Sequence, residues 1–212
     1  MRDKKESKNK DAYTELINEN NLTYDDYASI DDGYRYELVD GQLELMSPAP
    51  SVTHQMISFQ MQKEIGKSCE SDYIILYAPV DVILADNEVR QPDLVLIHRK
   101  RLDILSNRGV IGPPDLVVEI LSPSTLKRDK IDKLNTYANF RIPEYWIIEP
   151  KAGILEQYSL HDEQYRLIDV FQENAHVTSP HIPCISFTMA QIMERIPIIW
   201  ISGGLSPITL TR

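Results

Sequence analysis

The sequence has little cysteine, and its shortage excludes two kinds of site. Among 212 residues only Cys69 and Cys184 are cysteines, far apart and outside any CxxC or Cys/His pattern. We therefore expect neither a disulfide framework nor a zinc site, and we expect a reducing compartment, the cytoplasm.

The sequence also lacks a long apolar run near its C-terminus. Residues 196–202 (IPIIWIS) are apolar but far fewer than the ~20 that a membrane helix requires. This segment is expected to pack as a terminal segment, with an oligomer contact as the alternative.

The sequence also lacks an excess of positive charge and the common nucleotide-binding and hydrolase motifs. Its net charge of −10 argues against the broad basic surface of a nonspecific nucleic-acid binder, so a polyanion partner must meet a local patch or a bound cation. The local basic clusters are residues 98–108 and 126–133. No GxGxxG, Walker A or GxSxG pattern is present, which leaves a generic α/β small-molecule enzyme unsupported.

No internal repeat, low-complexity tract or long Gly/Ser linker divides the chain. A hydrophobic content of 42% is enough for one sizeable core, so a single domain over residues 11–200 is expected. Residues 1–10 are charged and lack a following apolar segment, so they are interpreted as a disordered tail and not as a signal peptide. Residues 201–212 are expected to form a C-terminal tail.

Residues 36–46, YELVDGQLELM, predict an N-terminal β-hairpin. Asp40-Gly41 is a strong two-residue turn signal between two alternating runs, and it places Glu37 opposite Glu44. Directly opposed like charges cost stability unless water or a cation separates them. A solvated face is the ordinary interpretation of such glutamates, and a functional pair is the alternative.

The remaining pattern interleaves helices with apolar strands. After a short helical opening over residues 11–29, with Thr23 as a cap, Ser51 can cap a helix that runs to about Lys67. Further strands are expected at 73–84, 89–97, 116–122, 144–150, 154–160 and 165–170, with helices at 125–139 and 189–195. This order predicts an α/β fold in which helices flank a central mixed β-sheet.

Two carboxylates in apolar surroundings are the candidate functional residues. Asp93 opens the run QPDLVLI, and Glu119 lies in the middle of the apolar run 116–122. An ionised carboxylate in a buried strand is costly without a partner, and a cation would resolve the cost. Asp93 and Glu119 on neighbouring strands, with a backbone carbonyl such as that of Ile120, would suit Mg²⁺. The alternative is a structural ion pair between Glu119 and an Arg or Lys.

The helix after this strand supplies two candidate lysines. At about 100° per residue, the apolar arc of residues 125–139 comprises Leu126, Ile131, Leu134, Tyr137 and Ala138. Lys130 falls within the arc and Lys133 at its edge, so either could reach inward or extend into solvent. The spacing does not choose between them.

The sequence contains, in this order, YELVDG, SPAPSVTHQ, QPDLVLI and PPDLVVEILSPST followed by DKIDKLNTYANFRIPEYWIIEP. Over about residues 22–195 these segments resemble the Uma-two family of the PD-(D/E)XK nuclease superfamily. The resemblance implies a restriction-endonuclease-like core and a metal-dependent endonuclease that cleaves DNA with Mg²⁺ or Mn²⁺. Asp93 matches the motif aspartate and Glu119 the (D/E), whereas Leu121 stands where the superfamily has its lysine. The position that matches the family's displaced lysine is Lys133, and Glu37 matches the acidic residue of the hairpin.

The resemblance also gives these residues expected roles. Asp93 and Glu119 would bind the metal, and Lys133 would orient or help to deprotonate the attacking water. Glu37 would support the metal or a water molecule in its outer shell. His54, at a helix N-terminus, is a weaker candidate. A homodimer is expected as well. The alternative function is a catalytically silent module that keeps the fold and binds nucleic acid or protein.

Overall fold

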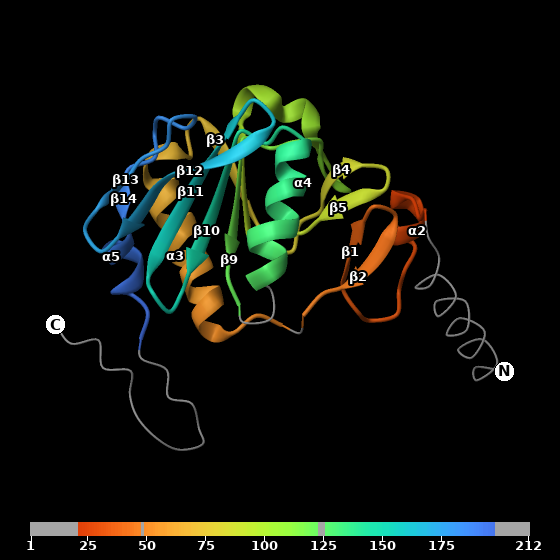
Figure 1. The fold of residues 1–212 in the computed structure, drawn as a ribbon, viewed down its shortest axis with the longest axis horizontal. Helices are drawn as coiled ribbons and strands as arrows, with labels where there is room; N and C mark the ends of the chain where they lie inside the picture. The colour runs from red at the N-terminus through yellow and green to blue at the C-terminus, as the bar shows by residue number, and fades with distance from the viewer. Residues whose placement is uncertain (1–20, 48, 123–125, 198–212) are drawn as a thin grey trace, which may run out of the picture.

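The fold was obtained as a computed structural model that describes residues 21–47, 49–122 and 126–197. The tails expected at 1–10 and 201–212, and most of segment 196–202, lie outside these residues. Figure 1 shows a central sheet with helices packed on both of its faces and a second sheet beside it. The expected α/β class and mixed sheet are confirmed, with the hairpin belonging to the second sheet.

The central sheet has the order β12-β11-β10-β9-β6-β3 in the described part of the chain. Its strands are β3 (Tyr73–Tyr77), β6 (Leu94–His98), β9 (Leu116–Ile120), β10 (Glu144–Glu149), β11 (Ile154–His161) and β12 (Gln164–Gln172). The pair β9 and β10 is parallel, and the other neighbours are antiparallel. Parallel strands need a long crossover connection, and the helical segment between β9 and β10 supplies it.

The second sheet, which we call the hairpin sheet, has the order β2-β1-β5-β4-β8-β7. Its strands are β1 (Tyr36–Val39), β2 (Gln42–Leu45), β4 (Val82–Ala85), β5 (Glu88–Arg90), β7 (Leu105–Ser106) and β8 (Gly109–Ile111). The predicted hairpin register is confirmed, with Glu37 opposite Glu44. Asp40 and Gly41 have φ of 49° and 73°, the positive pair that a type I′ turn requires.

The described ranges contain six helical segments, some of which begin at a residue whose side chain caps the helix. They are α2 (Tyr24–Ala28), α3 (Val52–Cys69), η1 (Arg99–Ile104), the π-helical turn η2 (Arg128–Asp132), α4 (Lys133–Asn139) and α5 (Met189–Met193). The Thr23 and Ser51 side chains accept hydrogen bonds from the first turns of α2 and α3, which confirms both predicted caps. A two-stranded ribbon, β13 (His176–Val177) and β14 (Phe187–Thr188), precedes α5. None of the helices in the described ranges is long and apolar enough to cross a membrane.

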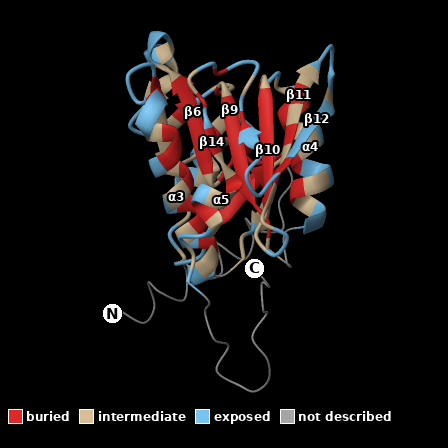
Figure 2. Ribbon diagram, turned by 90° about the vertical axis from the view of Figure 1, so that its left-hand side faces the viewer, coloured by how far each residue is buried: buried red, intermediate tan, exposed pale blue. Residues whose placement is uncertain are grey.

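Alternation along β9 divides the core into two sides. Leu116, Val118 and Ile120 pack with α3 and α5 on one face of the central sheet. Val117 and Leu121 pack with α4 on the other face. Figure 2 shows β6, β9 and β10 buried along most of their length between these layers. Glu119 follows the same alternation and therefore belongs to the face that α4 covers.

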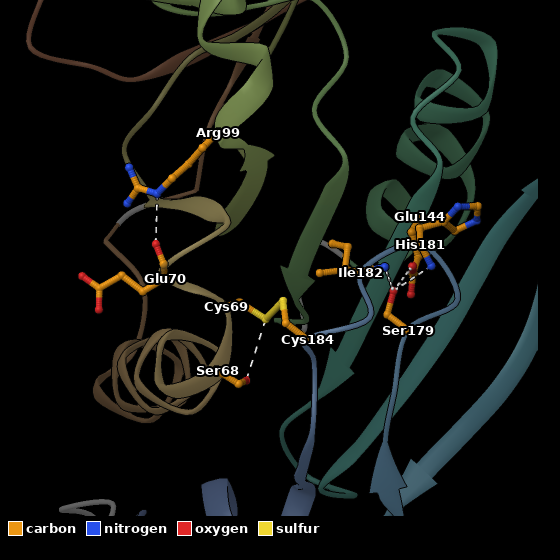
Figure 3. Close-up of a disulfide and its surroundings, with 9 residues drawn as sticks. All are labelled: Ser68, Cys69, Glu70, Arg99, Glu144, Ser179, His181, Ile182 and Cys184. Carbon is orange, nitrogen blue, oxygen red and sulfur yellow. Dashed lines mark hydrogen bonds between the residues drawn. A yellow bond between two sulfur atoms is a disulfide. The ribbon is translucent and has the colours of Figure 1, made fainter.

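The expectation that the two cysteines remain unpaired was wrong. Cys69 at the end of α3 and Cys184 form a disulfide across a sequence separation of 115 residues (Figure 3). Distance along the chain misled the prediction, because α3 and the segment before α5 cover the same face of the central sheet. Cys69 is fully buried within the core cluster of that face, and Cys184 packs against the cluster.

Candidate active site

Glu119 lies at the centre of the candidate site, buried between β9 and the following helical segment. Val117 and Leu121 on either side of it fill the apolar layer beneath α4. Glu119 Oε1 accepts hydrogen bonds from Lys133 Nζ at 2.7 Å and from the Tyr137 hydroxyl at 2.9 Å. Both partners come from one face of α4, so a single element positions the donors around this carboxylate.

The π-helical turn before α4 determines which lysine reaches Glu119. Within it the Lys133 N–H donates to the carbonyl of Arg128, five residues earlier, which widens the turn. Lys133 is buried against Glu119, whereas Lys130 points away and pairs with Glu156 at 2.6 Å. Of the two lysines that the sequence left open, the structure places Lys133 beside the carboxylate.

The same turn overturns part of the predicted apolar arc. Leu126 and Ile131 are about half exposed, at 49% and 51%, whereas Tyr137 is fully buried. The predicted apolar arc assumed a constant rotation of 100° per residue, whereas a π-helical turn advances each residue by a smaller angle. The residues before Lys133 therefore point in other directions than the arc predicted.

Glu37 is fully buried, which shows that the solvated interpretation of this residue was wrong. Strand β1 lies between β2 and β5, so Glu37 is enclosed, while Glu44 on the outer strand β2 is 43% exposed. Glu37 Oε1 accepts from the Gln91 N–H at 2.9 Å and lies 3.3 Å from Lys133 Nζ. Its Oε2 lies 3.7 Å from Arg90 Nη1. Glu37 thus joins the hairpin sheet to the lysine of the central site.

Asp93 lies just before β6, at the end of the central sheet where β9 finishes. Its Oδ2 accepts hydrogen bonds from the Ile120 N–H at 2.7 Å and from His54 Nε2 at 3.1 Å. His54 comes from the first turn of α3. Burial works to lower the pKa of His54, but its hydrogen bond to Asp93 and that carboxylate's charge outweigh burial and raise the pKa. The hydrogen bond from Ile120 therefore ties Asp93 to the peptide group that directly follows Glu119.

The electrostatics of the site show a surplus of carboxylates. Burial is the largest influence on the pKa of Glu119 and, with the charge of Asp129, raises it well above its ordinary value despite Lys133. Burial works to lower the pKa of Lys133, but the carboxylates around it, Glu119 first, raise it instead. Burial works to raise the pKa of Glu37, but Lys133 and Arg90 outweigh it and lower the pKa. Lys133 therefore remains an ammonium ion. Further positive charge beside Glu119 would stabilise its ionised carboxylate.

The carboxylates of Asp93 and Glu119 come from neighbouring segments of the central sheet, Asp93 just before β6 and Glu119 within β9. Leu94 pairs with Val118, so Asp93, one residue before, comes to the level of Glu119. In each carboxylate one oxygen accepts the hydrogen bonds given above, and the other accepts none from the described residues. No group of three or more His, Cys, Asp or Glu side chains in metal-binding arrangement occurs within the described ranges. A site here would use two carboxylates, the Ile120 carbonyl and retained waters, a ligand set that Mg²⁺ accepts.

With this geometry established, comparison with known proteins decides the family. The profile of the Uma2 family, described as "Putative restriction endonuclease", matches residues 23–190. The chain belongs to this family.

Two known proteins are similar to large parts of this chain. The uncharacterized protein sll1609 of Synechocystis sp. (strain ATCC 27184 / PCC 6803 / Kazusa) is 25% identical over 148 residues, which cover 66% of this chain and 81% of that protein. A crystal structure described as "a putative nuclease belonging to DUF820", from Anabaena variabilis ATCC 29413, matches with a TM-score of 0.67 and 17% identity. The match covers 82% of this chain and 98% of that chain. At this identity the structural likeness shows the fold alone.

The two local basic clusters of the sequence, residues 98–108 and 126–133, do not both adjoin the site. Residues 126–133 do adjoin it, through Lys133. Residues 98–108 do not, because β6 begins beside Asp93 and ends at His98, which carries Arg99 and the rest of η1 to the opposite end of the central sheet (Figure 1). A five-residue strand spans about 17 Å at ~3.3 Å per residue, which is too far for a shared phosphate contact.

Sequence reasoning missed several residues of the site. Asp129 is buried, with Oδ1 3.6 Å from Lys133 Nζ, and its position four residues before Lys133 was a usable signal. Tyr137 was assigned to the apolar arc, although its hydroxyl donates to Glu119. Arg90 beside Glu37 had no local signal, because the pairing of β5 with β1 brings the two together.

Proposed function

We propose that the chain is a metal-dependent endonuclease that hydrolyses DNA phosphodiester bonds through a PD-(D/E)XK-type site with a displaced lysine. The observation that carries the proposal is the buried contact of 2.7 Å between Lys133 and Glu119, at the sheet end where Asp93 also lies. Membership of the Uma2 family, described as "Putative restriction endonuclease", supports nuclease chemistry for this chain. A purely structural ion pair would not need Asp93 and Glu37 around it as well.

Asp93 and Glu119 would hold Mg²⁺ or Mn²⁺ through the oxygens that accept no hydrogen bond, together with the carbonyl of Ile120. A bound divalent ion supplies positive charge that neutralises the phosphate and lowers the pKa of a water molecule. The Ile120 N–H and His54 fix the orientation of Asp93 from the opposite side. These two donors would keep the carboxylate aimed in a single direction.

Lys133 would donate hydrogen bonds to the attacking water or to a phosphate oxygen. Because the surrounding carboxylates keep it protonated, it suits orientation and charge stabilisation and not proton removal. Glu37, at 3.3 Å, would act as a positioning residue that holds the ammonium group beside Glu119. In the reaction the water oxygen forms a bond to phosphorus, one phosphorus–oxygen ester bond breaks, and the departing oxygen takes up a proton.

A cleavage assay on duplex DNA tests the proposal. We expect cleavage with Mg²⁺ or Mn²⁺ that is lost with EDTA, and a fall of at least about 100-fold in Asp93→Asn, Glu119→Gln and Lys133→Met. Lys130→Met is the matched control. This variant removes a lysine of the same helical segment, but that lysine pairs with Glu156 and not with Glu119. The cleavage rate should therefore be unchanged.

Two results would contradict the proposal. Cleavage that persists in Asp93→Asn and Glu119→Gln would place the chemistry elsewhere. DNA binding by the wild-type protein without cleavage under any divalent ion would indicate a silent binding module that keeps the fold. Circular dichroism of each variant separates a lost reaction from a lost fold.

A further inference from the structure

Arg128 is a cation at the edge of the site to which no role has yet been given. It opens the π-helical turn and has 18% of its side chain exposed. We propose that Arg128 binds a backbone phosphate of the nucleic-acid substrate beside Lys133, and that Glu37 and Glu44 hold the guanidinium in place before substrate arrives. The inference rests on the proposed function and adds a specific phosphate-binding residue to it.

The contacts of Arg128 are long. Its Nη1 lies 3.9 Å from Glu37 Oε2 and 3.6 Å from Glu44 Oε2, and the guanidinium donates no hydrogen bond to any residue in the described ranges. Engaged arginine–carboxylate pairs have N···O distances of about 2.7–2.9 Å. Arg141 with Glu163 shows such a distance, 2.7 Å. Arg128 therefore keeps its donors available for another acceptor.

The π-helical turn directs Arg128 toward the same place as Lys133. In an α-helix, residues five apart point about 140° away from each other. In a π-helical turn the N–H of residue i+5 bonds to the carbonyl of residue i, which brings the two side chains to nearly the same side. Lys133 and Arg128 accordingly approach the two oxygens of one carboxylate, at 3.3 Å from Glu37 Oε1 and 3.9 Å from Oε2.

Release of Arg128 would break no hydrogen bond, because neither Glu37 nor Glu44 accepts one from it. Glu37 would keep the Gln91 N–H, Lys133 and Arg90, and Glu44 is partly in water. Long, partly exposed ion pairs contribute little to stability. The planar guanidinium fork matches two oxygens of a phosphate, which a lysine at the same position would not. A phosphate arriving at Lys133 would therefore find a second donor that is free to turn toward it.

DNA binding measured without cleavage tests the inference. Fluorescence anisotropy of a labelled duplex, with Ca²⁺ in place of Mg²⁺, would be followed over a series of salt concentrations. For Arg128→Gln we expect weaker binding and a slope of log K against log salt that is smaller by about one, the loss of one phosphate contact. The matched control is Arg141→Gln, which makes the same charge change beyond the far end of α4 and should leave the slope unchanged.

A second set of variants separates a phosphate contact from a structural tie between hairpin and helix. Glu44→Gln should tighten DNA binding several-fold by releasing Arg128, and the gain should vanish in the double variant Glu44→Gln/Arg128→Gln. Arg128→Lys should keep the salt slope but bind more weakly, because charge remains and the fork is lost. This variant decides the question if Arg128→Gln fails to fold.

The outcomes distinguish this inference from the proposed function. If the wild-type protein binds and cleaves DNA but the Arg128 variants keep its affinity and slope, the inference is overturned and the nuclease proposal stands. If the wild-type protein neither binds nor cleaves DNA, both are overturned.

Discussion

At the scale of single residues, Glu37 and Glu44 show how the same side chain takes two different environments within one hairpin pair. Their opposition could be predicted from Asp40-Gly41, because a two-residue turn fixes the register. The burial of Glu37 could not, because it depends on β5 pairing with β1 from far along the chain. The partners of Glu37 are likewise contributed by distant segments, so only tertiary structure makes this carboxylate part of the site.

Glu37→Gln should destabilise the protein in a pH-dependent way. The pKa of Glu37 lies below its ordinary value of 4.5 in the folded state, so its stabilising effect is complete above that value and is lost as pH falls through the folded pKa. At pH 7 we expect a loss of about 3–5 kcal/mol in the free energy of unfolding, because Lys133 and Arg90 lose a buried partner.

Urea unfolding at pH 7 and at a series of values below pH 4.5 would measure this effect, because the contribution of Glu37 begins to fall only there. The difference between wild type and Glu37→Gln should shrink as the solution is acidified, whereas Glu163→Gln at an exposed position should match wild type throughout. A difference that is constant with pH would show that Glu37 is not an ionised partner of the lysine.

At the scale of elements, the caps and apolar spacings were sufficient to predict where most helices and strands lie. Ser51 began α3 as expected, and Ile57, Met61 and Ile65 at helical spacing are all fully buried. The π-helical turn could not be predicted, because the assumption of a uniform α-helix contains no position for an extra residue. That turn decides between Lys130 and Lys133, so the candidate site was only partly predictable from periodicity.

Deletion of Ile131, an exposed residue of the π-helical turn, should restore an α-helical phase ahead of Lys133. Lys133 and Tyr137 should keep their contacts with Glu119, because α4 is held by its buried residues. Arg128 should stay on the side of Lys133, because the deletion leaves the two residues four apart, which is about 40° around an α-helix. We expect circular dichroism and a salt slope of DNA binding that are both close to wild type.

Deletion of Asn135, an exposed residue within α4, is the contrasting case. It changes the phase between Lys133 and Tyr137, so one of the two must leave Glu119, and both stability and cleavage should fall. Equal behaviour of the two deletions would contradict the assignment of the extra residue to the π-helical turn.

At the scale of the whole molecule, a central mixed sheet with flanking helices was predictable because the apolar strands alternate with amphipathic segments. The extension of the hairpin into a six-stranded second sheet was not, because β5, β4 and β8 join it through short non-local pairings. The pairing of Cys69 with Cys184 was hidden for the same reason. Spacing in sequence carries no information about two segments that meet on one face of a sheet.

Reduction of the disulfide should lower the stability of the protein. Closing a loop of 115 residues restricts the unfolded chain, and loss of such a link costs roughly 2–5 kcal/mol. Thermal unfolding with and without a phosphine reductant would measure the change, and Cys184→Ser should unfold at a temperature that no longer responds to the reductant. A wild-type protein indifferent to reductant would show that the link does not form in solution.

The homodimer expected from the family resemblance is a separate proposal. Sedimentation velocity at micromolar concentration should give about twice the chain mass of 24.4 kDa. A single species at the mass of one chain would reject it.

The covalent link between Cys69 and Cys184 encloses the segments that carry Asp93, Glu119 and Lys133 in one closed ring of polypeptide. A protease that cut the backbone once inside this ring would open it without freeing either fragment. On a denaturing gel the nicked protein would keep the mass of the intact one until a thiol was added, and only then separate into two bands.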